Sequence, residues 1–175
     1  MDFLELAKKR YSTRQFQNKK VEKQKIEAII NAAHVAPTAA NLQPQKLLIL
    51  DSPEQLSKLA PYANFYNAPV VIVVLAETAC SWKRHYDNKY FAEIDCAIVT
   101  DHMMLEATSL DLGSVWIGNF SPEDIKKEFL IPQDLDVVSI LAIGYAEQNT
   151  TLSPERHKQT RKSISELIYN TEDFL

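Results

Sequence analysis

Residues 91–112, FAEIDCAIVTDHMMLEATSLDL, carry the longest helical pattern of the chain. Apolar side chains occupy several faces of the expected helix, at Ile94, Ala97, Ile98, Met104, Leu105, Ala107 and Leu110. A helix with so little polar surface is typical of a buried core element or an oligomer interface. Gly113 follows as the expected C′ residue, so the helix is predicted to end there.

Strands and shorter helices are predicted on both sides of this helix. The predicted strands are residues 46–50, 70–75, 114–117 and 137–145, and the segments 70–75 and 137–145 are apolar enough to be buried. The predicted helices are residues 21–35, 53–60 and 122–130, the last two begun by Ser-Pro pairs that suit a helix start. A few strands among more numerous helices indicate an α+β layered fold, and a sheet this small predicts an oligomer that covers it.

The composition fits a single domain that spans residues 1–175. Hydrophobic residues make up 46% and charged residues 24% of the chain, which argues against wholesale disorder. The net charge of −4, with scattered basic residues, gives no indication of a nucleic-acid surface. The apolar runs are too short to span a bilayer, and the acidic N-terminal residues do not fit a signal peptide. Cys80 and Cys96 have no close partner, so neither a disulfide framework nor a zinc site is expected, and the cytoplasm is the simplest location.

Residues 10–14, RYSTR, place two guanidinium groups and two aliphatic hydroxyls in five positions of an acidic chain. Such groups suit a bound phosphate, although a solvated basic helix end is an alternative explanation. The three glycines, Gly113, Gly118 and Gly144, are too far apart to form a phosphate-binding loop. If the protein holds a phosphate, the side chains of residues 10–14 must bind it.

Two other segments lack a regular period. Residues 37–44, PTAANLQP, are predicted to form a loop whose small side chains allow a flat ligand to approach the backbone. Residues 82–90 are predicted to be irregular or a lid. No hydrolase motif is present, His102 and Cys96 are expected to be structural, and no metal site is predicted. A chain without a visible nucleophile or acid–base pair suggests a cofactor that carries the chemistry.

Five segments in order resemble the nitroreductase family of flavin enzymes. They are residues 9–16 (KRYSTRQF), 36–44 (APTAANLQP), Asp95-Cys96 leading to 112–118 (LGSVWIG), 143–145 (IGY) and the pair Arg161-Lys162. Each segment alone is weak, but together they span nearly the whole chain. The sequence departs from the family pattern at Gln45, where many relatives have an aromatic residue, and at Ser163, where a proline is common.

The resemblance implies a three-layer α+β sandwich with a small, mostly antiparallel sheet, assembled as a domain-exchanged homodimer that binds FMN. Arg10, Ser12 and Arg161 would contact the phosphate and ribityl chain, beside Tyr11, with Lys158 or Lys162 as further phosphate ligands. Arg14 would approach the pyrimidine edge of the flavin. The isoalloxazine would be lined by Pro37, Thr38, Ala39, Asn41 and Gln43 of the other subunit, and by Ile117, Gly118 and Asn119.

The function that the resemblance implies is transfer of hydride from NAD(P)H through flavin N5 to a nitro compound, a quinone or a related acceptor. One site serves both half-reactions, so ping-pong kinetics are expected. Two alternatives remain open at this point. One is an FMN-binding storage or sensing protein with little turnover, and the other is a structural dimer in which Arg10 and Arg14 bind carboxylates.

Overall fold

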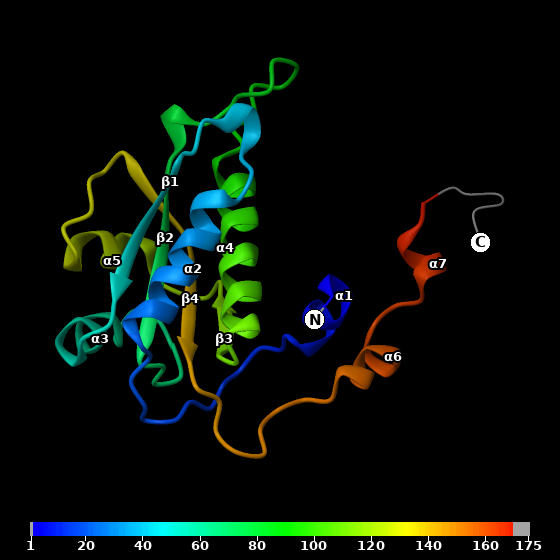
Figure 1. Cartoon of the computed structure of the whole chain (residues 1–175). Helices are drawn as coiled ribbons and strands as arrows, with labels where there is room; N and C mark the ends of the chain where they lie inside the picture. Colours follow the sequence, from blue (N-terminus) through cyan, green and yellow to red (C-terminus); the bar gives the residue numbers. More distant parts are fainter. Residues whose placement is uncertain (1, 170–175) are drawn as a thin grey trace.

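The computed structural model describes residues 2–169, which are built around a four-stranded antiparallel sheet (Figure 1). The strands are β1 (Gln45–Leu50), β2 (Val70–Glu77), β3 (Gly113–Ile117) and β4 (Leu135–Gly144), in the spatial order β1-β2-β4-β3. The register between β2 and β4 shifts once, between Val74 and Leu75. All four strands were expected from the sequence, and β2 is buried on both faces as its continuous apolar run predicts.

Helices cover both faces of the sheet. On one face lie α2 (Lys23–Val35) and α4 (Ala92–Ser109), and on the other lie α3 (Pro53–Leu59) and α5 (Pro122–Glu128) (Figure 1). Successive side chains of β2 point alternately to the two faces of the sheet. Ile72 and Val74 pack with α2 and α4, whereas Val71 and Val73 pack in the core on the other face. The fold is therefore the predicted α+β three-layer sandwich.

The end of α4 differs from the prediction. The helix stops at Ser109, and the left-handed C′ position is occupied by Asp111, with φ 59°, rather than by Gly113. The N–H groups of Leu112 and Asp111 donate to the carbonyl oxygens of Ala107 and Thr108, at 2.9 and 3.2 Å, which is a Schellman motif. Aspartate tolerates the left-handed region, so this helix ends without glycine.

Gly113 instead opens β3, where another segment approaches it closely. A Cβ atom at this position would lie 2.4 Å from Oγ1 and 2.8 Å from Cγ2 of Thr13. Thr13 is itself buried, and its N–H donates to the carbonyl oxygen of Ser114 at 2.9 Å. The missing side chain of Gly113 therefore lets the N-terminal segment lie against β3.

The helices α2 and α5 are each two residues shorter than the predicted helices at residues 21–35 and 122–130. α2 begins at Lys23 because Glu22 is its N-cap, and α5 ends at Glu128 because Leu130 adopts a left-handed φ of 51°. Residues 82–90, predicted to be irregular, include a hairpin closed by an antiparallel bridge between Lys83 and Tyr90.

The two ends of the chain lie outside the sandwich. α1 (Phe3–Lys9) packs on α4 and on η3 (Pro154–Arg156). The following α6 (His157–Thr160) and α7 (Ile164–Leu167) extend away from the sheet (Figure 1). Two further 3-10 turns are η1 (Ala39–Asn41) and η2 (Thr78–Cys80). Within residues 2–169, none of the helices has the length and hydrophobicity to cross a membrane.

The contact at Gly113 can be tested by mutation. Gly113→Ala should destabilise the protein by about 1–3 kcal/mol, because the new methyl group overpacks against Thr13. Gly118→Ala is the matched control: no atom lies within 4 Å of its Cβ position, so its effect should stay within about 0.5 kcal/mol. Urea unfolding measures both, and equal stability of the two variants would contradict the proposed contact.

Candidate functional site

The segment after α1 is extended and lies along β3. Ser12 forms a parallel bridge with Ser114, and Thr13 points into the core. Because alternate residues of an extended chain share a face, Arg10, Ser12 and Arg14 lie on the side opposite Thr13. The basic cluster thus begins at Arg10, the C-cap of α1, and continues along an extended segment.

The C-terminal segment closes a cavity over these residues. The Arg156 guanidinium donates to the carbonyl oxygen of Lys8 at 3.0 Å and to that of Arg10. His157 Nε2 lies 3.2 Å from the same Lys8 oxygen. The resulting cavity has a volume of about 300 Å³ and is lined by Arg10, Tyr11, Ser12, Arg14, Leu152, Arg156, His157, Thr160 and Arg161. We call it the arginine cavity.

The arginine cavity is strongly cationic. Among residues 2–169, no carboxylate forms an ion pair with any of its four arginines, and none lines it. Burial and the neighbouring charges of Arg10 and Arg161 lower the pKa of Arg156 from its usual range. Like charges held together in this way destabilise one another unless an anion joins them. The arrangement suits a phosphate, whose oxygens accept from guanidinium forks and from the Ser12 hydroxyl.

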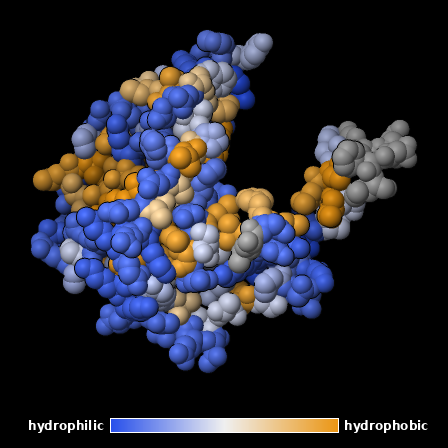
Figure 2. Space-filling model, viewed as in Figure 1, coloured by the Kyte–Doolittle hydropathy of each residue, from blue (hydrophilic) through white to orange (hydrophobic). Residues whose placement is uncertain are grey.

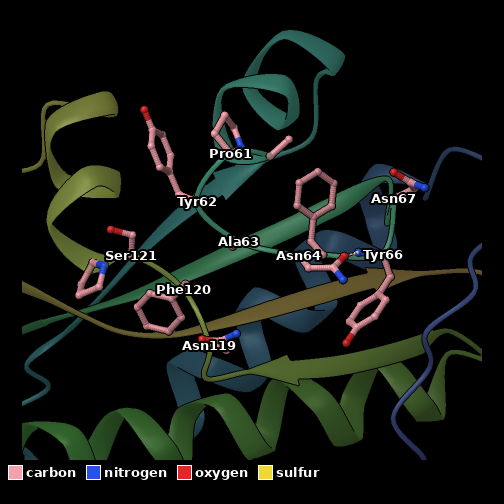
Figure 3. A pocket seen from close by; sticks show the side chains of 12 residues that line it. Pro61, Tyr62, Ala63, Asn64, Tyr66, Asn67, Asn119, Phe120 and Ser121 are labelled. Atoms are coloured by element: carbon pink, nitrogen blue, oxygen red, sulfur yellow. Dashed lines mark hydrogen bonds between the residues drawn. The ribbon is translucent and has the colours of Figure 1, made fainter.

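A second cavity, of about 750 Å³, lies between the segment that joins α3 to β2 and the loop after β3 (Figure 3). Its lining is neutral and is rich in amide and aromatic side chains: Tyr62, Asn64, Phe65, Tyr66, Asn67, Asn119 and Phe120. The Arg14 guanidinium lies 5.9 Å from the centre of the Tyr66 ring. Arg14 lines one cavity and touches the wall of the other, so the two are neighbours. We call the second the amide–aromatic cavity.

Several residues that line these cavities were not predicted from the sequence as site residues. Tyr66 and Asn67 both have left-handed backbones, with φ of 58° and 56°, and such strain is common at functional sites. The signal was the run YANFYN at residues 62–67, which carries aromatic and amide side chains between two regular elements. Arg156 was also not predicted as a candidate binding residue, because its place in the cavity depends on the packing of η3 on α1.

The other predicted ligands near these cavities divide into two groups. Asn119 lines the amide–aromatic cavity, while Gly118 is exposed beside it. Ile117 points into the core and is 7% exposed. Lys158 forms an ion pair with Glu155 and does not line the arginine cavity, and Lys162 does not line it either.

The predicted loop of residues 37–43 lies at the other end of α4 (Figure 1). Its Ala39 N–H donates to Asp95 in the first turn of that helix, at 2.9 Å. The basic segment is tied to the opposite end, where Lys9 Nζ bonds Asp111 at 2.6 Å. With a rise of about 1.5 Å per residue, these anchors are roughly 20–25 Å apart. One chain therefore does not bring the loop and the arginine cavity together.

The residues expected to be structural have the expected surroundings. His102 Nδ1 lies 2.9 Å from the carbonyl oxygen of Ile98, within its own helix. Burial, with smaller effects of Asp95 and Glu93, raises the pKa of the Cys96 thiol to about 12, so this thiol is unreactive packing. Among residues 2–169, no three potential metal ligands lie close enough to hold an ion.

Comparison with known proteins supplies the family. A family model described as "Putative TM nitroreductase" matches residues 2–174. The crystal structure of a nitroreductase family protein from Clostridium difficile 630 is 46% identical, covers 97% of this chain and 98% of its own, and superposes with a TM-score of 0.93.

Two further relatives have names that state an activity or a cofactor. A protein of Methanothermobacter thermautotrophicus named "Putative NADH dehydrogenase/NAD(P)H nitroreductase" is 32% identical, over 85% of this chain and 80% of its own length. An FMN-dependent nitroreductase from Clostridium difficile R20291 is 25% identical with a TM-score of 0.74, covering 97% of this chain and 98% of its own. The matching model and these relatives cover nearly all of the sequence, and the chain therefore belongs to the nitroreductase family.

Proposed function

We propose that this protein is an FMN-dependent oxidoreductase that uses NAD(P)H to reduce nitro compounds, quinones or a related acceptor. The observation that carries the proposal is the arginine cavity, without an ion-pair partner among residues 2–169, directly beside the amide–aromatic cavity and joined to it at Arg14. An anionic group and a flat polar ring in one ligand match this pair of cavities. The relatives named above, including an FMN-dependent nitroreductase, support the same choice.

The arginine cavity fits the phosphate of FMN. Arg10, Arg156 and Arg161 present guanidinium forks, and Ser12 adds a hydroxyl. Arg156 is already held by the carbonyl oxygens of Lys8 and Arg10, so little side-chain freedom would be lost on binding. The phosphate would replace mutual repulsion of the arginines with attraction.

The amide–aromatic cavity fits the pyrimidine edge of the isoalloxazine. The side chains of Asn64, Asn67 and Asn119 offer both donors and acceptors to ring carbonyl and N–H groups. Tyr66 restrains the Arg14 guanidinium by a cation–π contact. Arg14 would thus hold a positive charge at the edge of the ring.

When bound, FMN would supply the redox chemistry, which is hydride transfer from NAD(P)H and reduction of the acceptor. The protein's contribution is to bind and orient the partners. Arg14 would stabilise the negative charge of the reduced ring, and that interaction would be stronger in the product than in the reactant. The small side chains of Pro37 and Ala39 would leave one ring face open to nicotinamide and acceptor in turn.

We also propose that the active form is a homodimer in which residues 37–43 complete the partner subunit's site. Within one chain the loop and the arginine cavity lie at opposite ends of α4. Both terminal segments expose large apolar side chains, namely Phe3, Leu4, Ile164 and Leu167. Figure 2 shows this hydrophobic surface on the projecting C-terminal segment. A second copy of the chain would cover these residues and bring the two parts of the site together.

The phosphate assignment predicts the effect of Arg10→Ala. The purified protein should bind FMN and oxidise NADH or NADPH with menadione, and the variant should bind FMN about ten- to a hundredfold more weakly because it loses a charge-assisted contact. Lys23→Ala is the control, since Lys23 pairs with Glu27 on the exposed surface of α2. Titration of the FMN-free proteins measures both, and equal affinities for Arg10→Ala and the wild type would refute the assignment.

The position of Arg14 predicts a shift in flavin potential. Arg14→Ala should retain FMN but lower its midpoint potential by roughly 30–60 mV, because a contact of about 1.5–3 kcal/mol to the reduced ring is lost. Arg14→Lys keeps the charge and should lie closer to the wild type. Redox titration decides, and a wild-type potential in Arg14→Ala would place this residue away from the ring.

The shared site predicts complementation between inactive variants. Arg10→Glu disables the phosphate site, and Asn41→Trp blocks the loop. After subunit exchange, one pocket of each heterodimer carries both defects and the other is intact, so a random mixture should regain about a quarter of wild-type activity. Activity is measured before and after exchange of the two folded, inactive homodimers. A fully active monomer would contradict the shared site.

A further inference from the structure

The loop of residues 37–43 has a strained backbone. Ala40, Asn41 and Gln43 adopt left-handed φ angles of 51°, 55° and 52°, and none of them is glycine. Side chains with a Cβ atom disfavour this region, so each such residue raises the energy of the loop. A loop with this backbone needs an external contact to keep it in place.

That contact is made by Asp95. Its Oδ1 atom accepts the Ala39 N–H at 2.9 Å, and the residue is 1% exposed. The loop's other hydrogen bonds are internal: the Gln43 N–H donates to Thr38 Oγ1 at 3.1 Å, and the Asn41 N–H to the Thr38 carbonyl oxygen at 2.9 Å. Within residues 2–169, the Asp95 bond is the single hydrogen bond that joins residues 37–43 to another element, while the following Pro44 carbonyl oxygen accepts the Glu77 N–H of β2 at 2.9 Å.

The second carboxyl oxygen of Asp95 lowers the stability of the folded protein. Its second oxygen, Oδ2, is buried without a hydrogen-bond partner among the described residues. Burying an unsatisfied carboxyl oxygen is unfavourable, and a residue selected only for packing would avoid it. Asp95 also stands on a rigid support, because Ala92, Cys96 and Val99 of α4 are buried around it. A polar group kept on a rigid helix at such a cost is suited to positioning.

We infer that Asp95 is a positioning residue that clamps the strained loop in the conformation needed at the partner subunit's flavin. The inference rests on the proposed function, since it assigns this loop to an FMN site. Asp95 itself touches the loop backbone and not the cofactor. The place of the loop is therefore set by the buried helix α4 and not by the loop's own sequence.

The clamp can be tested first without FMN, by amide hydrogen exchange in the FMN-free protein. In the wild type, the bonded Ala39 amide should exchange at least about tenfold more slowly than the Ala40 amide. Asp95→Leu, similar in size but without an acceptor, should remove this protection, whereas Asp95→Asn keeps an acceptor oxygen and should retain most of it. Glu93→Gln is the control, because it removes an exposed acidic group from the same helical turn.

The second test uses the FMN-loaded protein. Asp95→Leu should lower kcat/KM for NADH with menadione roughly ten- to a hundredfold, because the loop is misplaced. FMN affinity should change less than about threefold, since the arginines carry most of the binding. The visible circular dichroism of the bound flavin should change as well. In Asp95→Leu, adding Ala40→Gly should restore part of the activity, because glycine relieves the left-handed strain.

The outcomes separate this inference from the proposed function. A wild type that fails to bind FMN overturns the proposed function, while the exchange experiment still decides the clamp. If FMN binds and depends on Arg10, yet Asp95→Leu leaves loop exchange, flavin dichroism and turnover unchanged, the clamp is refuted. If Asp95→Leu does not fold, the wild type still decides the question: equal exchange rates of the Ala39 and Ala40 amides would refute the clamp.

Discussion

Packing of α4 against both α2 and the sheet is the constraint on which the arrangement of this protein depends. The helix packs its buried side chains, among them Val99, Met103 and Ala107, into the core, so it cannot shift without loss of apolar contact. Its first turn holds the loop of residues 37–43, and the turn beyond its last residue is tied to the basic N-terminal segment. The length of one helix thus separates the two parts of the proposed site within a chain.

Energetically unfavourable features are found in both of these parts. One part holds four guanidinium groups with no carboxylate from the described part of the chain, next to two consecutive left-handed residues. The other holds three left-handed residues and the unpartnered Asp95 oxygen. The sandwich between them is built on the continuous apolar run of β2. Such features are expected where a stable scaffold supports a site arranged for a ligand, because local strain persists only when the surroundings enforce it.

Pattern and composition were sufficient for the elements of the fold. So many adjacent hydrophobic residues are explained by burial. The apolar run of β2 therefore indicates a buried strand, and the long pattern of α4 indicates a buried helix. The end of α4 was predicted wrongly because a glycine was assumed to take the left-handed position. Asp111 takes it, and Gly113 serves a contact with Thr13, a residue one hundred positions earlier.

The sequence by itself determined the layered α+β class and the family resemblance, and it predicted that Arg10, Ser12 and Arg14 bind a phosphate, because these depend on local residue chemistry. Only the tertiary structure decided that Arg156 joins them, that Arg14 stacks near Tyr66, and that the loop of residues 37–43 lies at the far end of α4. Each of these facts is a contact between segments distant in sequence. No periodicity or spacing encodes such contacts, since they are set by how the helices and strands pack.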